Sequence, residues 1–228
     1  MRRVRLTTLL CLALFGCRTM PAALPTPNAT LEQRFAAWEA AGPTGDDAHR
    51  AKLQNLVTAL KAEYARRGSI DVLFVCTHNS RRSHMGQLLG AVAAARAGVP
   101  VRTFSGGTEA TAFNPRAIAA LTRVGFQIDG SGEKNPHFQV KWSAAPAIEA
   151  FSKTIDDAAN PSADFVAVMV CSQADAACPF VKGATQRVSV PYEDPKVADG
   201  TPEEAQRYDE RVEQLGRDLS WVFRQVKG

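Results

Sequence analysis

The sequence predicts an α/β fold, an open parallel four-stranded sheet with helices on both faces, preceded by N-terminal helices. Two apolar runs rich in β-branched residues, at 70–76 and 164–171, have the composition of buried strands, and the stretches 99–107 and, more weakly, 186–191 indicate two further strands. Segments with helical periodicity alternate with them, at 85–98, 114–126 and 201–226. This alternation favours parallel strands joined by crossover helices.

The first 16 residues read as a signal peptide. A basic start, MRRVR, is followed by the apolar run LTTLLCLALF, which is too short to span a bilayer. The stretch LFGC then resembles a bacterial lipoprotein cleavage box, in which Cys17 would become the lipidated first residue. An ordinary cleaved signal and an uncleaved anchor are the alternatives. Under each alternative we expect the mature chain to be exported, and lipidation at Cys17 would leave it on a bacterial membrane facing the periplasm.

The next two stretches are predicted to be a tether and a helical segment. Residues 17–30 are rich in proline and small residues, as in a linker. Residues 31–68 have apolar residues at helical spacing, and Gly68 supplies a stop. The sequence leaves open whether these helices pack on the main domain or lift it from the membrane.

Residues 69–228 are predicted to form one catalytic domain. Pro115 suits the first turn of its second helix, and Thr201 with Pro202 suits the start of its last. Residues 127–160 show no clean period, and we expect a loop region there with one short helix near Ala147.

Composition places the chain among globular proteins and argues against a nucleic-acid partner. Charged residues make up 22% of the 228 residues, and the formal net charge is +4. Without residues 1–16 the balance is 24 basic against 23 acidic residues. No basic stripe interleaved with aromatic residues is present, so a substrate has to be sought at a local site.

A cysteine lies at the most informative junction of the chain. Cys76 ends the first predicted strand, and CTHNSRRS leads into a helix. Ligands in open parallel sheets bind beyond the carboxyl ends of strands, where loop amides and a helix N-terminus favour anions. Arg82 can add a two-pronged contact to an oxyanion, and the same field stabilises a thiolate. We therefore predict an oxyanion site at Thr77, His78, Asn79, Ser80, Arg81, Arg82 and Ser83 around the nucleophile Cys76.

This C-x5-R-S loop between strand and helix closely resembles the signature of low-molecular-weight protein tyrosine phosphatases and of the thioredoxin-coupled arsenate reductases that share their fold. The resemblance covers residues 69 to the C-terminus. It implies that Cys76 is the nucleophile and Arg82 the oxyanion clamp. It also implies that Ser83 stabilises the thiolate, and that Asn79 holds the loop in shape.

The resemblance extends to the stretch YEDPK and to a second pair of cysteines. It implies that Asp194 is a general acid, although an Asp-Pro pair is also common in plain turns. The C-x6-C pair of Cys171 and Cys178 looks like the redox relay of the reductases. A relay implies a thioredoxin-like reductant, which has to be periplasmic if the enzyme is exported. A structural disulfide is the alternative for this pair.

Three functions remain open from the sequence. The first is an arsenate reductase-like enzyme that uses all three cysteines, and the second is a phosphatase for phosphotyrosine or another phosphomonoester. Phe113, Trp142 and Tyr192 are candidates to wall a phosphotyrosine pocket. The third is a tethered oxyanion-binding module without turnover. No metal or cofactor is expected, since His78 and His84 lack a third ligand nearby, and Gln87 replaces a glutamate that the reductases use at a potassium site.

Overall fold

The computed structural model describes residues 24–228. The predicted signal peptide, with Cys11, and the predicted lipidation site Cys17 lie outside the described residues. Within residues 24–228, no helix combines the length and the apolar character needed to cross a membrane.

A four-stranded parallel sheet in the order β2-β1-β6-β7 forms the centre of the molecule. Its strands are β1 (Ile70–Cys76), β2 (Val101–Gly107), β6 (Phe165–Met169) and β7 (Ala184–Ser189). Residues of β1 and β6 are buried along their whole length, which explains why both are continuous apolar runs. The predicted sheet is confirmed.

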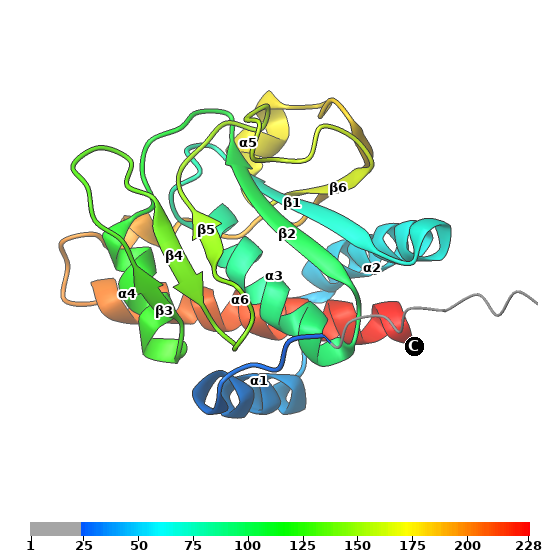
Figure 1. Ribbon diagram of the computed structural model, residues 1–228, viewed down its shortest axis with the longest axis horizontal. Helices are drawn as coiled ribbons and strands as arrows, with labels where there is room; N and C mark the ends of the chain where they lie inside the picture. Colours follow the sequence, from blue (N-terminus) through cyan, green and yellow to red (C-terminus); the bar gives the residue numbers. More distant parts are fainter. Residues whose placement is uncertain (1–23) are drawn as a thin grey trace, which may run out of the picture.

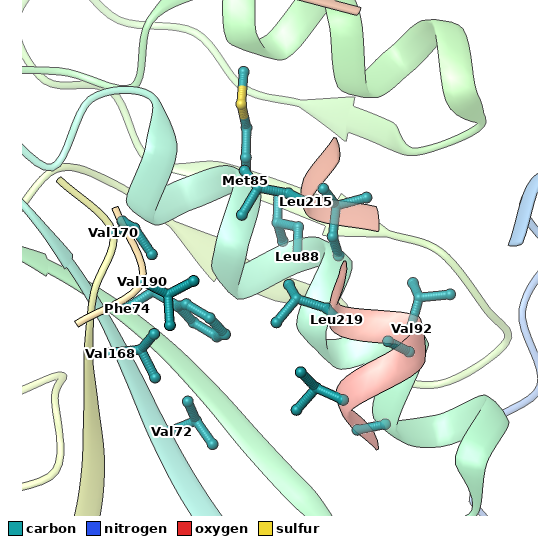
Figure 2. Packing of buried hydrophobic residues seen from close by; sticks show 14 of the residues in the cluster. Val72, Phe74, Met85, Leu88, Val92, Val168, Val170, Val190, Leu215 and Leu219 are labelled. Carbon is teal, nitrogen blue, oxygen red and sulfur yellow. The ribbon is translucent and has the colours of Figure 1, made fainter. Parts of the chain in front are cut away.

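Helices flank this sheet, as Figure 1 shows. Helix α3 (Arg82–Ala97) packs on β1 and β2, α2 (Asp47–Arg67) packs on β6 and β7, and α5 (Ser172–Ala177) contacts β1 and β6. Helix α6 (Glu204–Lys227) contacts α1 (Ala29–Ala41), α2, α3 and α4 (Pro115–Val124). Figure 2 shows that Val72, Phe74 and Val168 of the sheet face Leu88 of α3 and Leu219 of α6 across the core.

The segment between residues 127 and 160 differs from the prediction. It forms a second, three-stranded antiparallel sheet from β3 (Gln127–Asp129), β4 (Phe138–Lys141) and β5 (Ile148–Ala150). The prediction of a short helix near Ala147 is wrong, because Ala147 directly precedes strand β5. Strands of three or four residues are too short to carry a periodic signal.

The last helix begins three residues later than predicted. Thr201 does not cap it, because the Thr201 hydroxyl donates to the carbonyl of Ala198 in a preceding turn. The short 3-10 helix η1 (Pro195–Ala198) lies just before that turn. The Glu204 carboxylate accepts from the Gly200 amide at 2.6 Å, so the first helical residue closes the turn.

Candidate active site

The loop from Cys76 to Ser83 connects β1 to α3 at the carboxyl end of the sheet. Cys76 is paired in register with Gly107 at the end of β2. A Cβ atom on Gly107 would lie 2.6 Å from the Asn79 amide and 2.7 Å from the Thr77 carbonyl oxygen. Only glycine at position 107 therefore lets β2 approach the loop this closely.

The thiol of Cys76 is buried and contacts a hydroxyl. Its Sγ lies 3.1 Å from Ser83 Oγ, and Asn79 Nδ2 donates to the same Oγ at 2.8 Å. Because Asn79 Nδ2 can only donate, the proton of the Ser83 hydroxyl is free to point at Cys76 Sγ. A hydroxyl that donates to sulfur stabilises the thiolate form.

Asn79 stabilises the loop through both polar atoms of its side-chain amide. Its backbone is left-handed, with φ of 43°, and its Oδ1 accepts from the Lys153 amide at 2.8 Å. Ser152 donates to the carbonyl of His78 at 3.0 Å. Ser152 and Lys153 follow β5, so the second sheet positions the loop from outside.

The backbone of the loop directs its carbonyls outward. The carbonyls of Thr77, His78 and Ser80 accept from Glu109, Thr111 and Asn114, respectively. Within residues 24–228, no amide of Thr77 to Arg81 donates to another group, and those of Arg82 and Ser83 start a helix, where they have no intrahelical partner. These amides are therefore available to a tetrahedral anion beside Cys76 Sγ.

Arg82 is buried and held by one short segment. Its NH1 donates to the carbonyl of Tyr192 at 2.9 Å, and its NH2 pairs with Asp194 at 2.8 Å. The structure thus brings Asp194 to the loop that carries Cys76. In this arrangement the carboxylate pairs with the guanidinium that an oxyanion would engage.

Arg81 and His78 contribute differently from Arg82. The Arg81 guanidinium turns away to Tyr208 Oη, at 2.8 Å, and to Asp199, so the structure does not bring that side chain to the thiol. His78 lies half exposed at the rim, 3.6 Å from Glu109.

Two basic side chains are buried behind the loop. Burial, and next the Lys153 ammonium, lower the pKa of His84 to about 3, so this imidazole is neutral at pH 7. It stacks on Phe113, with ring centroids 4.0 Å apart. Burial lowers the pKa of Lys153 to about 8.

The second cysteine pair flanks α5. Cys171 is fully buried, and its Sγ lies 3.5 Å from Thr77 Oγ1 of the loop and 3.3 Å from the Ala174 amide that it caps. Cys178 ends α5 and is partly exposed. Cys76, Cys171 and Cys178 are all free thiols, so the pair does not form a structural disulfide here.

The three aromatic candidates do not form a pocket wall. Phe113 is buried against His84, and Tyr192 is buried with its hydroxyl on Asp218. Trp142 lines a separate cavity of about 380 Å³ beside β2, together with Val101 and Ile148. None of the three is thus placed to stack on a phenyl ring at Cys76.

Sequence reasoning missed the residues that support the site from a distance. Ser152, Lys153, Tyr208 and Asp199 contact the loop or its neighbours, but no motif marks them. Gly107 did carry a signal, because two glycines end a strand that neighbours the nucleophile strand.

Comparison with known proteins identifies the relatives of this chain. No family model matches. The arsenate reductase of Halalkalibacterium halodurans is 31% identical over 149 residues, which are 65% of this chain and 91% of that protein. The arsenate reductase of Bacillus subtilis is 30% identical over 149 residues, again 65% of this chain and 91% of that protein. The chain belongs to the arsenate reductase family.

Solved structures with the low-molecular-weight phosphatase fold are also similar to this arsenate reductase family member. A YwlE mutant from Bacillus subtilis has a TM-score of 0.49 at 20% identity, covering 70% of this chain and 100% of that one. An arsenate reductase in the phosphate binding state has a TM-score of 0.42 at 18% identity, covering 68% and 96%. The predicted relationship to the arsenate reductases is confirmed by the two curated relatives, so the chain belongs to a family of enzymes.

Proposed function

We propose that this protein is an exported arsenate reductase that uses three cysteines in sequence. The single observation that carries the proposal is the placement of the second thiol. Cys171 Sγ lies 3.5 Å from Oγ1 of Thr77, the residue that follows the nucleophile in the chain, while Cys178 at the far end of α5 is partly exposed. A phosphatase needs only the first thiol, and a buried second thiol at the same loop suits electron transfer.

The first step is attack of the Cys76 thiolate on arsenate. A sulfur–arsenic bond forms, and one arsenate oxygen leaves as water after protonation. Loop amides and Arg82 carry the negative charge of the remaining oxygens. Arg82 is released for this role when the oxyanion replaces Asp194 as its partner.

The next two steps move the electrons. The Cys171 thiolate attacks Cys76 Sγ, the sulfur–arsenic bond breaks, and arsenic leaves with the electron pair as arsenite. Cys178 then attacks Cys171 Sγ, which frees Cys76 and leaves a Cys171–Cys178 disulfide. A dithiol reductant of the thioredoxin type restores both thiols and is itself oxidised.

Helix α5 has to open during this relay. Cys171 and Cys178 are its two caps. A helical rise of 1.5 Å per residue separates their Cα atoms by about 10 Å, whereas a disulfide requires roughly 4.4–6.8 Å. Phe180, 76% exposed and two residues after Cys178, offers an apolar contact to the reductant beside the disulfide.

Phosphomonoester hydrolysis is the second candidate function. It needs Cys76, Arg82 and Asp194, all of which meet at the loop. In that reaction Asp194 would protonate the leaving oxygen, but it would first have to release Arg82. Because no aromatic side chain among Phe113, Trp142 and Tyr192 lies at the thiol, we expect weak hydrolysis of small esters and no preference for phosphotyrosine.

Thiol mapping after exposure to arsenate tests the proposal. We expect a Cys171–Cys178 disulfide to appear only with arsenate, and Cys171→Ser or Cys178→Ser to abolish repeated arsenate reduction. Hydrolysis of para-nitrophenyl phosphate should persist in both variants and vanish in Cys76→Ser. If both single variants reduce arsenate at the normal rate, the three-cysteine relay is refuted.

The location of the enzyme is part of the same proposal. The basic start, the apolar run and the LFGC stretch before Cys17 support export and lipidation. Radiolabelled palmitate should label the wild-type chain and not Cys17→Ser. Labelling that persists in Cys17→Ser would exclude this lipid anchor.

A further inference from the structure

Three consecutive residues of α6 receive the N-terminal segment, defined as residues 24–68. The indole of Trp38 packs on Gly216 so closely that a Cβ there would lie 2.3 Å from the ring. Arg217 donates to the carbonyls of Ala41 and Gly42. Asp218 accepts from Thr44. The catalytic domain is thus shaped to bind this segment.

Asp218 is fully buried, and most of its hydrogen bonds come from the N-terminal segment. Its Oδ1 accepts from the Thr44 amide at 2.7 Å and from Thr44 Oγ1 at 3.0 Å. Its Oδ2 lies 2.7 Å from His49 Nε2 and 3.1 Å from Tyr192 Oη. A buried carboxylate needs such donors, because it has lost its hydration.

Tyr192 links Asp218 to the active site. Burial, and next the Asp218 charge, raise the pKa of Tyr192 well above 10, so its hydroxyl keeps the proton that it donates to Asp218. The carbonyl of Tyr192 accepts from Arg82 NH1 at 2.9 Å. Asp194, two residues later, binds NH2 of the same guanidinium.

We propose that the N-terminal segment is a positioning element of the active site. Thr44 and His49 fix Asp218, Asp218 fixes Tyr192, and the Tyr192 carbonyl holds Arg82 in the direction of the oxyanion. Thr44, His49 and Asp218 are positioning residues, because none of them touches the loop that carries Cys76. The inference rests on the proposed oxyanion role of Arg82, and it assigns a task to a segment that precedes the catalytic domain.

The test measures how tightly inorganic phosphate protects Cys76 from iodoacetamide. His49→Ala removes one donor of Asp218, and Tyr192→Phe removes the hydroxyl link while keeping the ring. We expect each to raise the dissociation constant for phosphate about fivefold or more, given typical couplings within one hydrogen-bond network. His49→Gln, which keeps a donor, should restore part of the affinity.

Arg217→Gln is the matched control. It weakens the contact with the same segment, through Ala41 and Gly42, without touching the chain from Asp218 to Arg82. We expect it to lower the midpoint of thermal unfolding and to leave the phosphate dissociation constant unchanged. Both substitutions interrupt the same series of contacts from Asp218 through Tyr192 to Arg82. The dissociation constant for phosphate of the double variant His49→Ala with Tyr192→Phe should therefore not exceed the larger of the two single-variant values.

The outcomes separate the two proposals. Wild-type protein whose Cys76 is not protected by phosphate would contradict the oxyanion site itself. Protection in the wild type, with unchanged affinity in His49→Ala and Tyr192→Phe, would overturn the positioning role and reduce the segment to a structural support. If His49→Ala does not fold, Tyr192→Phe alone gives the same decision.

Discussion

Ser83 is the residue whose contact with Cys76 is most direct. Its hydroxyl proton is free for the sulfur because Asn79 already donates to its oxygen. A hydrogen bond to a charged group contributes about 1.5–3 kcal/mol. We expect Ser83→Ala to slow alkylation of Cys76 by iodoacetamide at pH 6.5 about tenfold or more. The exposed variant Ser162→Ala is the control, and an equal rate in both would show that Ser83 does not stabilise the thiolate.

His84 makes the free energy of unfolding depend on pH. Its pKa is about 3 in the folded chain and 6.5 in a model peptide, so below pH 6.5 the unfolded chain binds a proton that the folded chain excludes. The free energy of unfolding therefore falls as the pH drops toward 3. From 1.36 kcal/mol per pH unit, the contribution between pH 7 and pH 4.5 is about 2–3 kcal/mol.

Urea unfolding at pH 7 and pH 4.5 measures this effect. His84→Gln, which cannot titrate, should lose less stability between the two pH values than the wild type, while the exposed variant His137→Gln should behave like the wild type. Equal losses in wild type and His84→Gln would place the acid sensitivity elsewhere.

At the residue scale, the site can be predicted from the sequence where the reactive residues are close together along the chain. Cys76, Ser83 and Arg82 lie within eight consecutive residues between a strand and a helix, and the structure brings Asp194 to them. Arg81 is the exception, since its guanidinium serves Tyr208 and Asp199. The direction of the Arg81 side chain depends on its contact with α6, which lies more than a hundred residues later in the chain. The residues around Arg81 therefore do not predict this direction.

Helix α5 is the element that has to move in the proposed relay, and contacts from β7 hold it in place. Arg187 donates to the carbonyls of Cys178, at 2.8 Å, and Asp175, at 2.6 Å, and also pairs with the Asp175 carboxylate. Ser189 donates to the same carboxylate at 2.6 Å. These contacts oppose the opening of α5 that a Cys171–Cys178 bond requires.

We expect Arg187→Gln to open α5 more often, because it removes these donors from the helix. Alkylation of Cys178 and formation of the Cys171–Cys178 disulfide after arsenate should both become about tenfold faster, as for a change of 1.4 kcal/mol. Arg207→Gln, at a partly exposed position of α6, is the control. Unchanged rates in Arg187→Gln would mean that another contact limits the opening.

At the element scale, prediction succeeds for long elements and fails for short ones. The four strands of the parallel sheet and helices α1 to α4 are confirmed because each carries a sustained apolar pattern. The antiparallel sheet of β3, β4 and β5 depends on pairing between residues that are distant in sequence, such as Ile128 with Val140. Pairing of this kind is decided by tertiary contacts.

The whole molecule depends on the N-terminal segment for its core. Trp38 is almost fully buried on Gly216, so Trp38→Ala would leave a cavity that the rigid helix cannot fill. We expect this variant to lose about 3–5 kcal/mol of the free energy of unfolding, measured with urea. The partly exposed Trp221→Ala should lose clearly less, and an equal loss would show that the segment is loosely packed.

The sequence predicts helices in this segment but not where they lie. Helical spacing in residues 31–68 identifies an apolar face without naming its partner. The partner of that face is α6, through Gly216, Arg217 and Asp218. Three consecutive residues of these types form no motif, so the sequence alone does not indicate the contact.

Leu24 and the thiol of Cys76 lie at opposite ends of the sheet. Leu24 lines the cavity beside Val101, where β2 begins, and Cys76 is paired with Gly107, where the seven-residue strand ends. Seven strand residues span about 20 Å. The described chain thus begins about one strand length away from the reactive sulfur, and the proposed lipid anchor at Cys17 precedes Leu24, at that remote end of the sheet, by seven residues.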